Sequence, residues 1–139
     1  MTPATSPTVF FENTAGQVLA DPAGYLYLRW GDQPRTLAET QAILQSVSKG
    51  LQQYGWSKML GSQLDMPPFS AEEQAWIAHE WLPHAVQVAG YRSGAILLAT
   101  NLYARLATAF VTTSVQGLPM RYRSFDSEAE AIAWLLMQP

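Results

Sequence analysis

Residues 8–32, TVFFENTAGQVLADPAGYLYLRWGD, alternate short apolar runs with turn signals and decide how the sheet of this protein begins. The turn signals are TAG at residues 14–16 and DPAG at residues 21–24. They separate three expected strands, at about residues 9–12, 17–20 and 25–30. Strands joined by such short turns pair antiparallel, so the segment predicts an amino-terminal meander.

A helical pattern replaces this rhythm after the third strand. Apolar residues recur at intervals of three and four positions from Leu37 to Leu51, which places them on one face of a helix. Thr36 and Glu39 have the spacing of a capping box, in which each side chain bonds the backbone of the other residue. Gly55 marks the expected end of this helix.

The rest of the chain continues to alternate strands with helices. The expected strands are WSKMLGSQ (56–63), YRSGAILLA (91–99) and PMRYRSF (119–125), and LDMPPF (64–69) is an expected loop. One expected helix is opened by the capping pair Ser70 and Glu73 and closed by Gly90. Two more follow, from Asn101 to about Ser114 and in DSEAEAIAWLLM (126–137). YRSGAILLA is apolar almost throughout, as in a central strand covered on both faces. Leu102, Leu106 and Phe110 form one stripe of the third helix. The last helix is capped either by Asp126 or by Ser127 with Glu130.

These elements predict a mixed α/β fold. We expect a single-layer mixed β-sheet of about six strands, which starts as an antiparallel meander and continues as alternating strands and helices, with four helices. Parallel neighbours in such a sheet are joined by right-handed crossovers. Residues 1–7, MTPATSP, are expected to form a flexible tail, and residues 8–139 a single domain.

The composition narrows the function classes. Hydrophobic residues make up 48% of the 139 residues and charged residues 14%, so a folded domain with an unusually neutral surface is expected. The net charge of −3 and the lack of a basic run disfavour nucleic-acid binding. The chain has no cysteine, which excludes disulfides, thiolate zinc sites and thiol nucleophiles. The first basic residue is Arg29 and the apolar runs are short, so we expect no signal peptide, no membrane insertion and a cytoplasmic location.

The sequence HEWLPH, from His79 to His84, is close to the zinc-protease motif H-E-x-x-H but one residue longer. A spacing of five puts the two histidines about 140° apart on an α-helix, whereas a zinc pair lies four apart on one side. Pro83 is expected to end or kink the helix at this point, because it removes a hydrogen bond. We therefore expect two helix-end histidines and no metal site.

Other catalytic motifs are also missing from the sequence. No G-x-S-x-G elbow, glycine-rich phosphate loop or Walker lysine occurs, and capping explains Ser70. Acidic pairs such as Glu72 and Glu73 lie in first helical turns, where the helix dipole favours them. The sequence gives no reason to expect a cofactor.

Three arginines are candidates for an anion-binding patch. Arg121 and Arg123 alternate along the last strand and so project to one face, and Arg92 joins them if its strand is adjacent. The alternative is that these side chains line a solvated edge or pair with nearby acidic residues.

The aromatic residues suggest a binding surface. Trp76 and Trp81 are five residues apart, so on one α-helix they cannot both point squarely into the same core. Trp81 is the residue that we expect to face outward, as tryptophans at interfaces do. The loop 64–69 adds three apolar side chains, which are Leu64, Met66 and Phe69. These five residues predict a docking surface or a pocket mouth, and the alternative is that the loop folds under as a lid on the core.

The carboxyl-terminal stretch MRYRSFDSEAEAIAWLL (120–136) resembles the closing element of SpoIIAA-like proteins of the STAS/SEC14-type α/β group. The matching positions are Phe125, Asp126, Ala131, Trp134 and Leu135. The order of elements from about residue 25 to 137 is similar to that group as well. This resemblance implies a SpoIIAA-like domain that binds a partner or a small apolar ligand without catalysis.

Phosphorylation, which regulates some members of that group, is not carried over to this chain. The group's phosphorylated serine lies in a D-S-S-G-like context where a central strand runs into a helix. Here the sequence LGSQLDMPPFSAEE (60–73) has no such tetrad. Ser62 and Ser70 are therefore only positional analogues of the phosphorylated serine.

The sequence thus leads to three hypotheses about function. The first is a non-enzymatic regulatory or protein-interaction module that pairs with itself as a homodimer or with another protein. The second is a carrier of a small apolar ligand or lipid, with its pocket between sheet and helices. The third is a hydrolase that uses His79 or His84.

Overall fold

The computed structural model describes residues 6–113 and 117–139 of the chain. Most of the predicted tail, residues 1–5, lies outside the described residues, whereas Ser6 and Pro7 are exposed and precede the first strand. The end of the third predicted helix at Ser114 and the side chain of Phe110 also lie outside them.

In the described residues, one sheet of six strands organises the fold, and its strands follow one another in chain order. The strands are β1 (Thr8–Asn13), β2 (Gly16–Asp21), β3 (Tyr25–Trp30), β4 (Lys58–Ser62), β5 (Ser93–Leu97) and β6 (Arg121–Phe125). β1, β2 and β3 pair antiparallel, which confirms the predicted meander. β3, β4, β5 and β6 pair parallel. The predicted mixed α/β fold is therefore confirmed.

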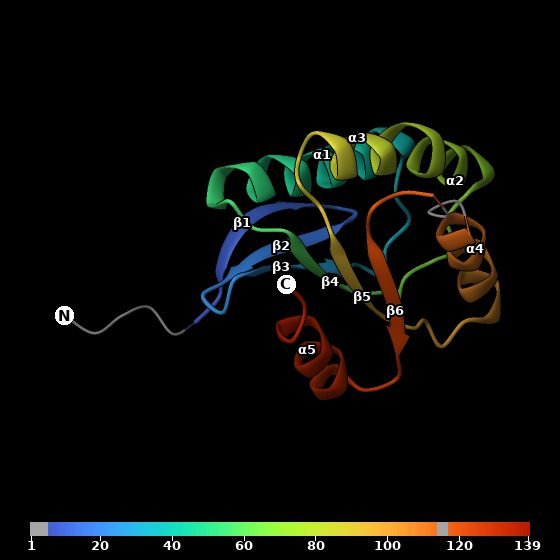
Figure 1. Cartoon of the computed structure of the whole chain (residues 1–139). Helices are drawn as coiled ribbons and strands as arrows, with labels where there is room; N and C mark the ends of the chain where they lie inside the picture. Colours follow the sequence, from blue (N-terminus) through green and yellow to red (C-terminus); the bar gives the residue numbers. More distant parts are fainter. Residues whose placement is uncertain (1–5, 114–116) are drawn as a thin grey trace.

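Four helical segments pack on the sheet in the part of the chain that the structure describes. They are α1 (Leu37–Tyr54), a continuous run made of α2 (Ala71–Trp76), the π-helix η1 (Ile77–Trp81) and α3 (Leu82–Gln87), then α4 (Leu102–Thr113) and α5 (Glu128–Leu136). From β3 to β6, each new strand is added on the same side of the strand before it. Because such crossovers are right-handed, the three connecting segments all lie on one face, and α5 covers the other (Figure 1).

Two hydrophobic cores result from this arrangement of the described residues. The larger core lies under α1, α2, η1, α3 and α4 and includes Leu26, Leu28, Ile43 and Val47. The smaller core lies under α5, where Ala131 and Leu135 meet Leu60 and Leu97. All five residues of β5 are buried, as predicted for a central strand covered on both faces. No helix of the described residues is long and apolar enough to cross a membrane.

The predicted caps are present. Thr36 with Glu39 and Ser70 with Glu73 both form complete capping boxes. Gly55 ends α1 with a φ of 69°, a left-handed conformation that glycine adopts without a Cβ clash. Ser127 caps α5 through the backbone N–H of Glu130, so the alternative cap at Asp126 is wrong.

Pro83 does not end its helix, so of the two effects expected of this proline, a stop or a kink, the stop is wrong. The backbone N–H of Leu82 bonds the carbonyl of Ile77, five residues back, which is the π-helical pattern. Proline lacks an N–H and its ring clashes with the carbonyl four residues earlier. The wider π-turn relieves this conflict, and the chain continues as α3 with Pro83 in its first turn.

The buried residues of this helical run explain why the π-turn fits there. They recur every fourth position, as Glu73, Ile77, Trp81 and Ala85, with a second line at Ala78, Leu82 and Val86. In a straight α-helix, a line with a spacing of four drifts around the axis by about 40° per step. One wider turn removes most of this drift and keeps both lines against the core.

The predicted stripe on α4 points the wrong way. Leu102 and Leu106 are 65% and 59% exposed, and Tyr103 beside them is 72% exposed. The residues that face the core are the smaller Ala104, Ala107, Thr108 and Val111. Small side chains allow α4 to approach its neighbours closely, so the large apolar residues are left outside.

Candidate functional site

A groove runs between α1 and the helical run from Trp76 to His84. Its volume is about 460 Å³. α1 forms one wall and the π-turn with its flanking residues forms the other. We call it the aromatic groove, and its lining residues are Gln45, Ser48, Lys49, Gln52, Trp76, Glu80, Trp81 and His84.

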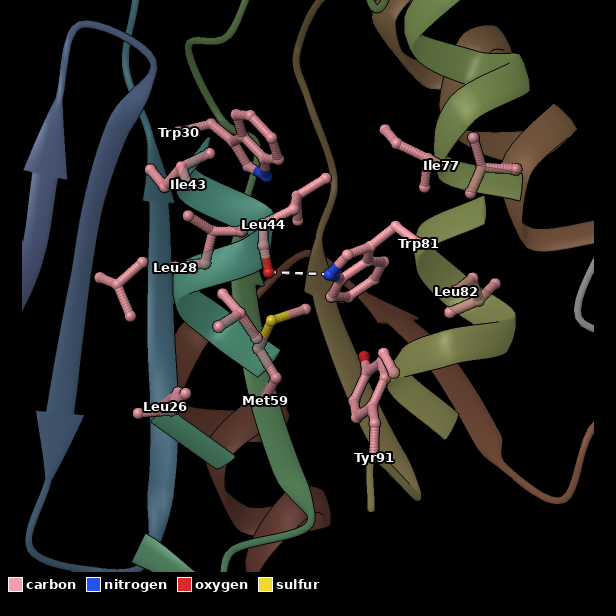
Figure 2. Packing of buried hydrophobic residues seen from close by; sticks show 14 of the residues in the cluster. Leu26, Leu28, Trp30, Ile43, Leu44, Met59, Ile77, Trp81, Leu82 and Tyr91 are labelled. Atoms are coloured by element: carbon pink, nitrogen blue, oxygen red, sulfur yellow. Dashed lines mark hydrogen bonds between the residues drawn. The ribbon is translucent and has the colours of Figure 1, made fainter. Parts of the chain in front are cut away.

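Trp81 forms the floor of the aromatic groove and is only 5% exposed. Its indole N–H donates to the backbone carbonyl of Leu44 at 2.7 Å (Figure 2). The same N–H lies 3.1 Å from the hydroxyl of Ser48, which accepts a second bond. These bonds fix the π-turn against the middle of α1. The expectation that Trp81 faces outward is therefore wrong.

The π-turn is the physical reason for this difference. The expectation rested on α-helical geometry, in which residues five apart diverge. A π-turn bonds residues five apart, so they lie about one turn from each other on nearly the same side. Trp76 and Trp81 consequently line the same groove, Trp81 as the buried floor and Trp76 as a half-buried wall residue.

The rim of the aromatic groove is polar and carries both signs of charge. Gln45, Lys49 and Gln52 on α1 and Glu80 and His84 on the opposite wall are all exposed. Within the described part of the chain, the ion pairs are Arg35 with Glu73 and Arg105 with Asp126. Lys49 and Glu80 therefore line opposite walls of the groove and pair with no described residue.

The structure separates the loop residues of the predicted docking surface, which lie between β4 and α2. Met66 and Phe69 are 2% and 7% exposed and belong to the larger core, so for them the lid alternative applies. Leu64 is 39% exposed, outside the groove, beside Thr100 at the end of β5. Of the five predicted binding residues, only Trp76 and Trp81 lie together in the aromatic groove.

A buried ion pair fixes this loop to the first helix. The Arg35 guanidinium contacts the Glu73 carboxylate through Nε at 2.7 Å and through a terminal nitrogen at 3.3 Å. It also donates to the carbonyls of Pro67 and Pro68 and lies over the rings of Trp30 and Phe69. The two charged side chains are 3% and 6% exposed.

The Glu73 carboxylate is held in its charged form by these contacts. Burial alone would raise the pKa of Glu73. Hydrogen bonds from the Ser70 backbone N–H, the Thr40 hydroxyl and Arg35, together with the charge of Arg35, outweigh that effect and lower the pKa below its ordinary value of 4.5. The Thr40 hydroxyl donates at 2.5 Å and the Ser70 N–H at 2.7 Å.

The three arginines of the predicted anion patch are only partly brought together. Arg92 and Arg121 line one pocket of about 410 Å³ where β5 and β6 begin, beside Leu118 and Met120. The Arg92 guanidinium is occupied by the carbonyls of Val86 and Tyr91. Arg123 lies apart, over the ring of Phe125.

The histidines and serines of the sequence hypotheses do not form a catalytic group. His79 and His84 are exposed, and among the described residues neither ring hydrogen-bonds a side chain. Ser70 caps α2, as predicted, and Ser62 ends β4. No group of three or more His, Asp or Glu side chains in residues 6–113 and 117–139 is placed to hold a metal ion.

The interior between sheet and helices holds little space. The cavity there has a volume of about 40 Å³ and is lined by Met59, Gln63 and Tyr122 among others. Tyr91 (Figure 2) is fully buried against Tyr122, and its hydroxyl makes no hydrogen bond of normal geometry with the residues that the structure describes. Burial raises the pKa of Tyr91 well above 10, and its neighbour Tyr122 raises it further.

Sequence reasoning missed the α1 wall of the groove and the exposed face of α4. Gln45, Lys49 and Gln52 look like the solvated side of an amphipathic helix, and nothing local says that another helix lies beside them. A signal for the π-turn was present in the four-residue spacing of the apolar positions.

No protein-family model matches the chain, and the searches of curated proteins and of solved structures give no significant match.

Proposed function

We propose that this chain is a non-enzymatic protein-interaction module of the SpoIIAA/STAS-like type, which binds a protein partner through the aromatic groove. The observation that carries the proposal is the make-up of this groove. A buried tryptophan forms its floor, a half-buried tryptophan forms part of one wall, and the rim is polar. An apolar centre inside a polar rim is the usual anatomy of a protein interface.

The shape of the groove favours a helical ligand surface. Both walls are helical, and their lining residues recur at helical spacing, as Gln45, Lys49 and Gln52 on α1 and as Trp76, Glu80 and His84 opposite. A helix can lie in such a groove and place its side chains between these ridges. Tryptophan is among the residues that contribute most to binding at interfaces, which makes Trp76 the expected anchor point.

The two alternative functions gain less support. Pockets for small ligands measure roughly 300–1,000 Å³. The cavity between sheet and helices, at about 40 Å³, is far too small for a lipid or similar ligand. The hydrolase alternative needs polar groups converging on a histidine, and His84 lies at the rim of the groove without a hydrogen bond to Ser48 or Glu80, both of which the structure describes.

Site-specific photo-crosslinking tests the proposal. A photoreactive amino acid at Gln45 places the probe on the groove wall, and the same amino acid at Glu12 on β1 is the control. Expressed in its native host, the Gln45 variant is expected to give a discrete protein adduct that the Glu12 variant lacks. Replacing Trp76 by Ala in the Gln45 variant should reduce this adduct. Equal labelling at both positions, or none at Gln45, would contradict the proposed function.

A further inference from the structure

The two unpaired charges of the aromatic groove lie at the same level on opposite walls. Lys49 follows Ser48 on α1, and Glu80 precedes Trp81 on the π-turn. The Trp81 indole bonds the Ser48 hydroxyl, which places these two positions side by side along the groove. Lys49 and Glu80 nevertheless form no ion pair with any residue that the structure describes.

This arrangement is self-complementary about a two-fold axis. An axis that runs along the groove, midway between its two walls and in the plane of their rims, carries the α1 wall of one copy over the π-turn wall of the other. Lys49 of each copy then faces Glu80 of its partner, and two equivalent ion pairs form. In a two-fold interface, residue i contacts residue j and residue j contacts residue i, which is the pattern that these charges satisfy.

We infer that the partner seated on the aromatic groove is a second copy of this chain, which forms a two-fold dimer with reciprocal Lys49–Glu80 pairs. This inference rests on the proposed function, because it names the partner of the same groove. α1 and the α2–η1–α3 run of both copies come together as four helices, with the half-buried Trp76 of each copy in the interface and the buried Trp81 beneath it. This is the arrangement of a four-helix bundle.

The charge of the groove supports this partner over others. Its rim carries one lysine and one glutamate, so the fixed charges cancel. A neutral rim gives no electrostatic attraction to nucleic acid, to an anionic membrane or to a strongly charged peptide. Both signs in equal number are what a surface needs to pair with its own copy. Because the rim is polar, we expect a dissociable dimer.

Charge reversal tests the pairing. Lys49→Glu places two glutamates against each other at both contacts of the dimer, and Glu80→Lys does the same with two lysines. Each variant alone should dimerise at least about tenfold more weakly than the wild type, because like charges face each other in the interface. A mixture of the two variants should recover the association, since each contact then joins a glutamate to a lysine. Both residues are exposed, so the variants are expected to fold.

Sedimentation velocity over roughly 1 μM to 1 mM, which covers weak to moderate affinities, measures each association. Glu12→Lys and Lys58→Glu, alone and mixed, are the matched controls away from the groove and should behave as the wild type. A chain that stays monomeric over this range, or a mixture that associates no better than its components, would overturn the inference.

The crosslinking experiment separates this inference from the proposed function. A Gln45 adduct of twice the chain mass supports both. An adduct with a different protein only would leave the groove as an interface and refute the second copy as its occupant.

Discussion

Glu73→Gln offers the sharpest test of how the loop 63–70 is fixed to the helices. The change keeps the size of the side chain and removes its charge, so the Arg35 guanidinium loses its counter-charge inside the protein. Glu73 accepts four hydrogen bonds, two from Arg35 and one each from Thr40 and Ser70. Glutamine has one acceptor oxygen where glutamate has two. Its NH₂ group is itself a donor, so it cannot accept the hydrogen bonds that Arg35, Thr40 and Ser70 donate.

The expected cost follows from the burial of the pair. Arg35 and Glu73 are 3% and 6% exposed at the side chain, so water screens them little. Removing one partner of a buried ion pair costs about 3–5 kcal/mol, because the remaining charge has no compensation. Arg35 keeps the carbonyls of Pro67 and Pro68, so we expect the lower end of this range, about 3 kcal/mol. Domains of this size have about 5–15 kcal/mol of stability, so the variant should still fold.

Urea unfolding followed by tryptophan fluorescence measures this cost, and a double-mutant cycle isolates the pair. We expect Arg35→Met to cost a similar amount, about 3 kcal/mol. The double variant should cost clearly less than the sum, with a coupling of about 2 kcal/mol. A loss below about 1 kcal/mol for Glu73→Gln, or additive effects, would refute a stabilising role for this pair.

The pH dependence gives the same test a second readout. The pKa of Glu73 is lowered in the folded protein, so its charge contributes stability that is complete above the unfolded value near 4.5. This contribution is lost as the pH falls through the folded pKa. The stability difference between wild type and Glu73→Gln should therefore be constant at neutral pH and shrink below about pH 4.5. A difference that stays constant into strong acid would contradict the assignment.

Three further predictions concern the larger core. Trp81→Phe should lower the free energy of unfolding by about 2–3 kcal/mol, because it removes two hydrogen bonds to α1 and part of the buried ring. Urea unfolding followed by circular dichroism measures this loss, and a loss below about 1 kcal/mol would contradict the prediction. Tyr91→Phe should leave stability unchanged or raise it by about 1 kcal/mol, because the buried hydroxyl has no hydrogen bond of normal geometry to any described residue, and a clear loss in melting temperature would show a partner for it. Gly94→Ala should destabilise by about 2 kcal/mol or more, because the new methyl group would clash with the Tyr91 hydroxyl, and Tyr91→Phe should restore part of that loss.

The local signals of the sequence predicted most of the elements. The turns at residues 14–16 and 21–24 separate the strands of the meander, and the capping boxes at Thr36 and Ser70 start α1 and α2. These signals work from the sequence because each involves residues that are within four positions of one another. The alternation of strands and helices also predicted the parallel part of the sheet.

The side chains at the candidate site could not be placed in the same way. Whether Trp81 is buried depends on Leu44 and Ser48, more than thirty positions away along the chain, and on a π-turn that changes which residues share a side. On α4, the choice between the large stripe at Leu102 and Leu106 and the small residues at Ala104 and Ala107 depended on how closely the neighbouring elements approach. Hydrophobicity alone favours the larger residues as the buried side, and close packing favoured the smaller ones.

The sequence by itself therefore determined the type and order of the elements, because turns, caps and periodicity are short-range properties of the backbone. Only the tertiary structure decided that α1 and the π-turn lie side by side, with Lys49 and Glu80 on opposite walls of one groove. A groove has no sequence pattern of its own, because it forms between the outward-facing side chains of two helices that are far apart in the sequence and pack side by side only in the folded protein.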